Sequence, residues 1–255
     1  RLLQIGKHSL SRADQAHLDA RARTTTASGP RTTSAGGGAE WPQWRGPDRD
    51  GKSADTGLLE SWPDGGPPVV WTTSAIGEGY SSVAVAGGIT YVTGAQRGQL
   101  TIFAFDGNGK QTWRTAHGPS WSRSYPGGRS TPTIDEGRLY LLSGPGRVAC
   151  YDAATGREQW AREMSEFGGS PGGWGFAESV LIVDDMAVVT PGGRNCMVAL
   201  DKKTGRTRWE SAGNGGAAHY GSAIHIASRG AEMIVGAGGD AAFEEANFLT
   251  KFAEK

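Results

Sequence analysis

One pattern that returns three times along the chain constrains the fold more than any other feature. Each copy contains an apolar run, an Asp, a Gly three or four residues later, and a Trp four residues after that Gly. The copies end on Trp113, Trp160 and Trp209, which are 47 and 49 residues apart. A period of about 40–50 residues made of short strands is typical of a β-propeller, whose blades are four-stranded antiparallel sheets. The pattern therefore predicts an all-β chain with about three to four blades.

The conserved spacing inside each copy has a mechanical interpretation. The Asp side chain is expected to cap a turn, and the Gly is expected to take the positive φ that closes a hairpin. The Trp then lies on the outgoing strand and packs its large ring against the neighbouring unit. The motif residues are Ala104, Asp106, Gly109 and Trp113, then Asp152, Gly156 and Trp160, then Ala199, Asp201, Gly205 and Trp209. In the middle copy, Cys150 stands two residues before the Asp, in place of Ala.

Two weaker signals extend the repeat. The apolar run 68–71 ends on Trp71, 42 residues before Trp113, and is expected to be the last strand of a blade on its own. In addition, a Ser or Thr recurs just before a few small or apolar residues, at Ser82, Thr131, Ser179 and Ser222. We interpret these segments as the innermost strands, because small residues suit the place where strands converge on a propeller axis. The fourth copy begins but lacks the Asp–Gly–Trp motif.

The chain divides into three parts. Residues 1–40 contain no Trp, Tyr or Phe and end in a run rich in Ser, Thr and Gly, so we expect a disordered leader with at most a short helix near Ser11–Arg23. Residues 41–239 hold the propeller repeats, and residues 240–255 form an atypical tail with mildly helical apolar spacing. Three to four blades are too few for a closed ring, so we expect an incomplete ring whose other blades lie in missing sequence.

Composition excludes several classes of function. The 41 Gly residues suit many tight turns. The formal net charge of zero argues against a nucleic-acid partner held by bulk charge. No apolar run reaches the ~20 residues of a membrane helix, so we expect no membrane span. The two cysteines, Cys150 and Cys196, are far apart and lack the spacing of a metal site, so both are expected to be small buried core residues.

These repeats resemble those of the pyrroloquinoline-quinone (PQQ) family of propellers. The opening segment 41–51, with the sequence WPQWRGPDRDG, is similar to that of exported bacterial proteins named after the outer-membrane assembly propeller. The resemblance covers about residues 41–235. It implies a quinoprotein-like ring of seven or eight blades and a periplasmic or otherwise exported location, although no signal peptide is visible in the chain.

The resemblance also raises the question of a quinone site. Enzymes of this family resemble one another in a pair of adjacent cysteines, a calcium ion held by acidic and amide side chains, and an Asp base. This chain has no Cys–Cys pair, and Asp184 and Asp185 are expected to lie in a solvated turn. We therefore expect no catalytic residue, metal or cofactor, and keep PQQ and calcium only for an alternative function.

Two further motifs are expected to be structural. Residues 144–149 match G-x-G-x-x-A, the phosphate-binding pattern of dinucleotide folds, but the next turn follows too soon to leave room for a helix, so they are expected to form a hairpin turn. His219 lacks the Asp and Ser partners of a hydrolase triad.

The remaining candidate site is the axial rim, where the inner strands begin. Its residues are expected to meet around one funnel and to bind a protein or a small ligand; the alternative is that they cap strand ends and face water. Arg129 and Glu178 could pair there, and the loops 121–128 and 168–175 could act as lids or as linkers. The axial rim comprises Tyr80, Ser81, Arg129, Ser130, Trp174, Glu178 and Tyr220.

Three functions remain open from the sequence. The first is a non-catalytic scaffold that binds proteins or ligands in the cell envelope. The second is a fragment of a PQQ-dependent dehydrogenase. The third is a sensor domain cut from a larger protein, for example one attached to a kinase. The missing Cys–Cys pair favours the scaffold, because the enzymes of this family have such a pair. The fold alone does not decide, since one fold serves many functions.

Overall fold

The computed structural model describes residues 40–236 except 59, 62, 65, 67, 68, 229 and 230. These residues all belong to one compact unit of the chain, Ser34–Lys255. The expected leader, apart from Glu40, lies outside the described residues, and so does the tail at 240–255.

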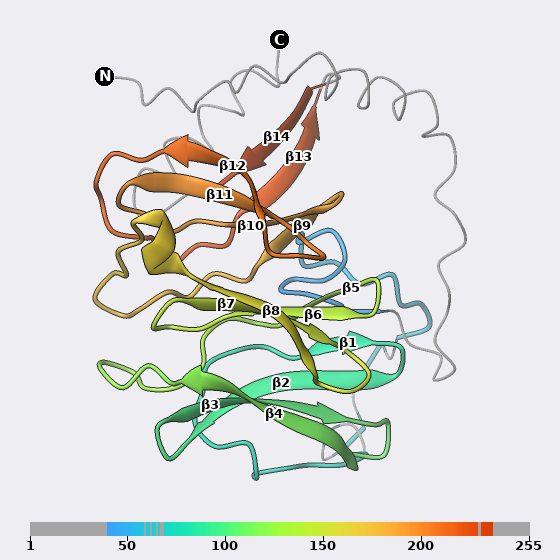
Figure 1. Ribbon diagram of the computed structural model, residues 1–255. Helices are drawn as coiled ribbons and strands as arrows, with labels where there is room; N and C mark the ends of the chain where they lie inside the picture. Colours follow the sequence, from blue (N-terminus) through green and yellow to red (C-terminus); the bar gives the residue numbers. More distant parts are fainter. Residues whose placement is uncertain are drawn as a thin grey trace. The chain divides into compact units, whose positions relative to one another are not determined.

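The described residues form three four-stranded antiparallel sheets and one two-stranded sheet (Figure 1). Within each sheet the strands are neighbours in chain order, as in propeller blades. The predicted all-β propeller with an incomplete ring is confirmed. Blade 1 contains β1 (Ala84–Ala86), β2 (Ile89–Gln96), β3 (Gln99–Phe105) and β4 (Gln111–Pro119). Blade 2 contains β5 (Thr133–Asp135), β6 (Arg138–Leu142), β7 (Arg147–Asp152) and β8 (Glu158–Glu163), followed by the short 3₁₀ helix η1 (Met164–Phe167). Blade 3 contains β9 (Leu181–Val183), β10 (Met186–Val189), β11 (Asn195–Asp201) and β12 (Thr207–Ala212), and the fourth unit contains β13 (Ile224–Ser228) and β14 (Ala231–Val235).

The innermost strands bring the four sheets together. β1 contacts β5, β5 contacts β9, and β9 contacts β13. Each inner strand begins two residues after the repeated Ser or Thr, which confirms the prediction that this repeat marks the inner strands. The hydroxyls of that repeat accept backbone hydrogen bonds from the preceding unit, so they tie each inner strand to the next.

The Asp–Gly turns form as the spacing predicts. In blade 2, Asp152 Oδ1 accepts hydrogen bonds from the backbone N–H and the hydroxyl of Thr155, at 2.9 and 2.7 Å. Asp201 Oδ1 makes the same pair of bonds to Thr204, both at 2.9 Å. Gly156 has a φ of 69°, a conformation that costs side-chain-bearing residues free energy. The turns therefore connect the two outer strands of each blade by local chemistry alone.

Blades 1 and 2 each hold the next blade through a Trp ring and one carbonyl group. The ring of Trp113 lies over Gly156, where a Cβ atom would come within 2.5 Å of it. Its Nε1–H donates to Ala153 O at 3.0 Å, and the hydroxyl of Tyr91 donates to the same oxygen at 3.2 Å. Trp160 repeats the arrangement over Gly205 in blade 3. Apolar side chains of adjacent blades fill the space between the sheets, so the core consists of interfaces between blades.

Trp71 packs as expected but does not lie in a strand. Its ring lies over Gly109 of blade 1 and against Phe105, with ring centroids 5.7 Å apart. The prediction of a strand at 68–71 is wrong for residues 69–71, which have no regular structure, and residue 68 lies outside the described residues. A strand needs a partner for its backbone groups, whereas Val69 and Val70 are exposed. The Trp-over-Gly contact therefore does not require the strand.

The cysteine prediction was correct for one residue and wrong for the other. Cys150 is buried, and burial raises the pKa of its thiol to about 12. Cys196 is exposed, because it lies between the inward-facing side chains of Asn195 and Met197 on β11 and so points to the opposite face. Neither cysteine forms a disulfide in the described part of the chain. The residues at 144–149 do form a hairpin turn, since Gly146 N–H donates to Ser143 O between β6 and β7.

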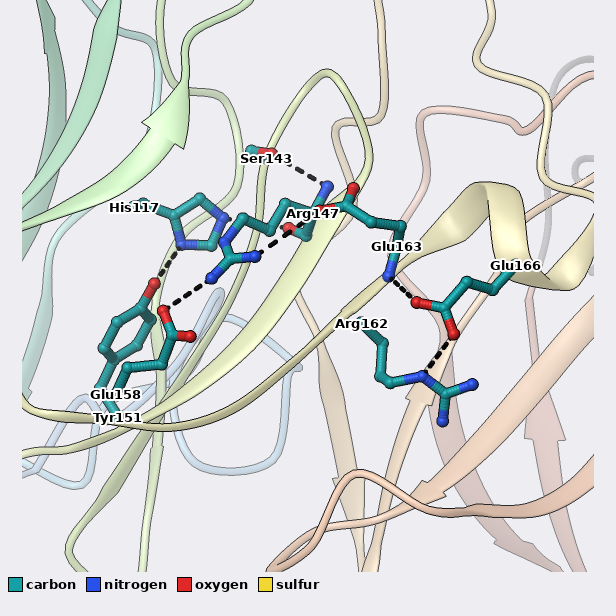
Figure 2. A network of polar contacts seen from close by, with 8 residues as sticks. All are labelled: His117, Ser143, Arg147, Tyr151, Glu158, Arg162, Glu163 and Glu166. Carbon is teal, nitrogen blue, oxygen red and sulfur yellow. Dashed lines mark hydrogen bonds and ion pairs between the residues drawn. The ribbon is translucent and has the colours of Figure 1, made fainter.

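A polar network joins blades 1 and 2 (Figure 2). His117 of β4 is buried, and its Nε2 contacts Arg147 O at 3.0 Å while its Nδ1 contacts the Tyr151 hydroxyl at 2.9 Å. A carbonyl only accepts, so Nε2 carries the proton and Nδ1 accepts from Tyr151. The Arg147 guanidinium pairs with Glu158 at 2.7 Å and with Glu163 at 3.6 Å. The network satisfies polar groups at the junction between blades 1 and 2.

Candidate functional site

Four aromatic rings of the axial rim region form a continuous exposed row. Tyr80 meets Tyr125 edge to face with centroids 6.1 Å apart, and Tyr125 meets Trp174 in the same way at 6.3 Å. Trp174 then contacts Tyr220 at 5.1 Å. The exposed fractions are 61% for Tyr80, 60% for Tyr125, 48% for Trp174 and 41% for Tyr220. We call these four residues the aromatic row.

The aromatic row comes from four equivalent loops, each of which leads into an inner strand. Tyr80 lies just before β1, Tyr125 between β4 and β5, Trp174 between η1 and β9, and Tyr220 between β12 and β13. The contacts between inner strands bring the ends of these loops together. The hydroxyl of Tyr220 also accepts a hydrogen bond from Trp174 N–H at 3.3 Å, which ties two of the loops to each other.

Arg129 contacts two members of the aromatic row, Tyr80 and Tyr125. Its guanidinium donates to the carbonyls of Ser124 and Tyr125, at 2.6 and 2.5 Å, and lies 5.9 Å from the Tyr80 ring centroid. These bonds hold the loop at Tyr125, whose φ of 56° is unusual for a side-chain-bearing residue. Arg129 therefore connects the first two rings through hydrogen bonds and a cation–π contact.

The other predicted rim residues lie below this surface. Ser130 is buried, and Ser81 Oγ accepts from the Thr93 hydroxyl at 2.9 Å. Glu178 is buried as well and accepts from the backbone N–H and the hydroxyl of Thr190, at 2.6 and 2.7 Å. The expected pairing of Arg129 with Glu178 is wrong: Arg129 bonds to carbonyls, and no ion pair between the two occurs among the described residues.

Glu178 is electrostatically unusual. Burial raises the pKa of its carboxyl to about 7, against the opposing effect of the two bonds from Thr190 and of the Arg49 charge. Arg49 is also buried, and burial lowers the pKa of its guanidinium to about 10. The Arg49 charge lowers the pKa of Glu178 and the Glu178 charge raises that of Arg49, so each partly offsets the effect of burial on the other.

Sequence reasoning missed Tyr125 and Arg49. Tyr125 lies in the loop 121–128, which the sequence predicted only as a lid or linker. The available signal was an aromatic residue in a loop that leads into an inner strand, as at the three other aromatic residues of the rim. Arg49 lies in the opening segment 41–51, and nothing in its local sequence indicates that its side chain reaches the loops that lead into β9 and β13.

The residues at the axis do not fit PQQ and calcium. The quinone-site features named above include adjacent cysteines, whereas Cys150 is buried on β7 and Cys196 is exposed on β11. Both oxygens of the buried Glu178 carboxyl accept hydrogen bonds from Thr190. Within residues 40–236 as described, no three His, Cys, Asp or Glu side chains gather as a metal site would require. Asp184 and Asp185 lie at the turn between β9 and β10, as predicted.

A protein-family model matches the repeat region of the chain. The family model described as outer membrane protein assembly factor BamB matches residues 100–244. No curated protein matches the chain in a sequence search. In the described part of the chain, no helix is both long enough and apolar enough to span a membrane.

Solved structures show partial similarity. A europium-containing methanol dehydrogenase is 19% identical with a TM-score of 0.42, over 56% of this chain and 26% of that one. BamB from Moraxella catarrhalis is 17% identical with a TM-score of 0.36, over 53% and 36%. Quinohemoprotein alcohol dehydrogenase from Comamonas testosteroni is 20% identical with a TM-score of 0.40, over 52% and 21%. The chain thus matches between 21% and 36% of the length of these three proteins.

Proposed function

The chain belongs to the family of the outer membrane protein assembly factor BamB, and on that premise we propose that it is a non-catalytic propeller scaffold of the cell envelope. In this proposal it binds other proteins through the aromatic row, and it uses neither a cofactor nor a metal. The family's name describes a factor in protein assembly, which is consistent with a periplasmic scaffold.

The observation that carries the proposal is the exposure of four adjacent aromatic rings. Tyr and Trp are enriched at the centres of protein interfaces, where they bury large area with little loss of side-chain freedom. Scattered exposed apolar residues are ordinary, but a continuous group marks an interaction site. Arg129 adds to this by holding the loop of Tyr125 in place, since a preorganised surface loses less entropy on binding.

The axis supports the non-catalytic part of the proposal. The buried Glu178 carboxyl accepts two hydrogen bonds from Thr190, and the Arg49 charge lowers its pKa against the effect of burial. A quinone-dependent enzyme of this fold would need groups that these residues do not supply. The proposed role therefore rests on the surface of the rim rather than on its interior.

Selection of peptides from a phage-displayed random library on the purified chain tests the proposal. Peptides enriched on the wild type should bind the double variant Tyr80→Ser/Trp174→Ser at least tenfold more weakly, which corresponds to about 1.4 kcal/mol. The matched control is Val69→Ser/Val70→Ser, which removes two exposed apolar side chains outside the aromatic row and should leave binding unchanged. Equal binding by all three proteins would remove the basis for the proposal.

A second measurement separates the scaffold from an enzyme. The wild type is incubated with PQQ and Ca²⁺ and assayed for dye-linked alcohol oxidation. We expect no turnover above that of PQQ and Ca²⁺ without protein. Turnover that requires the protein would overturn the non-catalytic role, whatever the peptide selection shows.

A further inference from the structure

The opening segment 41–51 lies against inner strands and the loops that lead into them. Trp41 pairs with Val85 of β1 through two backbone hydrogen bonds of 2.9 and 2.8 Å. Pro42 O accepts from Ile134 N–H of β5 at 2.7 Å. Arg49 then reaches the loops that lead into β9 and β13. The segment therefore touches all four sheets near the axis, next to the inner strands in Figure 1 (blue).

Arg49 makes an unusually complete set of hydrogen bonds. Its Nη1 donates to Ser179 O at 3.2 Å and to Ala223 O at 2.7 Å, and its Nη2 donates to Val180 O at 2.5 Å. Its Nε donates to the side chain of Gln43 within the same segment, at 2.8 Å. Only 5% of the residue is exposed. Three carbonyl oxygens from two units thus converge on one guanidinium group.

This arrangement matches the chemistry of guanidinium and not of a point charge. A planar guanidinium presents its donors in a fixed fork, whereas an ammonium group is compact and strongly hydrated. Burying a cation is costly unless it is hydrogen-bonded and balanced by a negative group. The three carbonyls supply the hydrogen bonds that offset this cost.

The rest of the segment is joined to the blades by few hydrogen bonds. From residue 44 to 51 the backbone bonds of the segment are internal: Gly46 to Gln43, Arg49 to Gly46, and Gly51 to Arg45. Among the described residues, the hydrogen bonds that tie residues 44–51 to the blades come from the Arg49 side chain. The Arg49 side chain therefore supplies the hydrogen bonds that join this part of the segment to the loops leading into β9 and β13.

We propose that the carbonyl oxygens of Ser179, Val180 and Ala223 form a guanidinium-binding site whose internal ligand is Arg49, and that the site takes the guanidinium group of another molecule once the Arg49 side chain is removed. This site is separate from the aromatic row, so it holds or fails independently of the proposed function.

Chemical rescue of Arg49→Ala in the full-length chain tests this site. The substitution should lower the Tm and leave a polar cavity. Ethylguanidinium chloride at roughly ten times its Kd should restore about half or more of the loss, because a ligand that binds only the folded state stabilises it. Ethylammonium chloride at the same concentration should not. The ethylguanidinium effect should be absent in the wild type, whose site is filled.

Arg45→Ala is the matched control, because Arg45 is exposed and donates only to Asp50 O within the segment. It should have a near wild-type Tm and no response to either salt. Absence of rescue, or equal rescue by ethylammonium, would overturn the proposal. If Arg49→Ala does not fold, Arg49→Lys decides: a clearly lower Tm than the wild type supports a guanidinium-specific site, and an equal Tm contradicts it.

Discussion

The backbone N–H of Thr131 donates a 2.9 Å hydrogen bond to the Oγ of Ser179, and this bond joins blade 2 to blade 3 beside the axis. Ser82 N–H donates to Thr131 Oγ1 at 3.1 Å, and Ser179 N–H donates to Ser222 Oγ at 2.9 Å. The four repeated Ser and Thr residues therefore form one relay across all four sheets. A sequence repeat of small polar residues becomes a line of contacts between blades.

Removing one hydroxyl of the relay should destabilise the fold. Ser179→Ala leaves the buried Thr131 N–H without its acceptor, so the free energy of unfolding should fall by about 1–3 kcal/mol. Ser179→Thr keeps the hydroxyl, as Thr131 itself does, and should recover most of that loss. Ser82→Ala is the control, because Ser82 takes part in the relay through its backbone N–H. Urea denaturation checks all three; an equal loss from Ser82→Ala would refute the role of the hydroxyl.

The contact between Trp113 and Gly156 should be sensitive to a single methyl group. Gly156→Ala places a Cβ within 2.5 Å of the Trp113 ring at a φ of 69°. Gly137→Ala meets nothing within 4 Å at a φ of 72°, so it measures the backbone strain alone, about 1–2 kcal/mol. Gly156→Ala should cost about 1–3 kcal/mol more, since overpacking adds to strain. Thermal denaturation of the two variants gives the comparison, and equal losses would show that the ring contact contributes nothing.

Trp71 should stabilise blade 1 although it lies outside any strand. Trp71→Ala removes the ring that covers Gly109 and contacts Phe105, and should lower the free energy of unfolding by about 3 kcal/mol. Val70→Ala, one residue earlier and exposed, should change it by less than about 0.5 kcal/mol. Urea denaturation followed by circular dichroism tests this pair of variants. Equal effects would mean that the Trp71 ring contributes no more to stability than an exposed Val side chain.

His117 should make the fold sensitive to acid. Burial lowers the pKa of its imidazole to about 4 from an ordinary 6.5. Its contribution to stability is therefore complete above pH 6.5 and is lost as the pH falls toward 4, by up to about 1.4 kcal/mol per pH unit. His117→Gln should remove this slope, whereas His219→Gln, at an exposed position, should leave it. Urea denaturation at pH 4, 5, 6 and 7 provides the measurement, and an unchanged slope in His117→Gln would contradict the assignment.

Glu178 should act in the opposite sense. Burial raises the pKa of its carboxyl from 4.5 to about 7, so its contribution is complete below pH 4.5 and is lost as the pH rises through 7. Glu178→Gln preserves an acceptor for Thr190 N–H and should remove this dependence, which makes the variant relatively more stable at pH 8 than at pH 5. The stability slopes due to His117 and Glu178 oppose each other between pH 4.5 and 6.5. Each single variant therefore leaves the slope of the other group, and the double variant should lack both slopes. A variant with the wild-type profile would exclude Glu178 as the source.

The sequence predicted the features that depend on local chemistry. The Asp152 turn, the positive φ of Gly156 and the packing of Trp113 follow from residue types at fixed spacing, and so does the start of each inner strand. The features it missed depend on what the fold brings from elsewhere. The strand at 68–71 lacks a partner, Cys196 faces outward because of the pairing of β11, and Arg49 reaches carbonyls 130 residues further along the chain. Likewise the aromatic row needed Tyr125, whose position is set by Arg129.

The relay also gives the arrangement of blades a direction. In each of its three bonds the donor belongs to the earlier unit and the acceptor to the later one. A unit placed before β1 would follow this rule by donating to the hydroxyl of Ser82, and a unit placed after β13 would follow it by offering a hydroxyl to Ser222 N–H. Blades can then add only head to tail. A ring completed under this rule would have a bond of the same kind, from a backbone N–H to a Ser or Thr hydroxyl, at every joint, including the one that closes it.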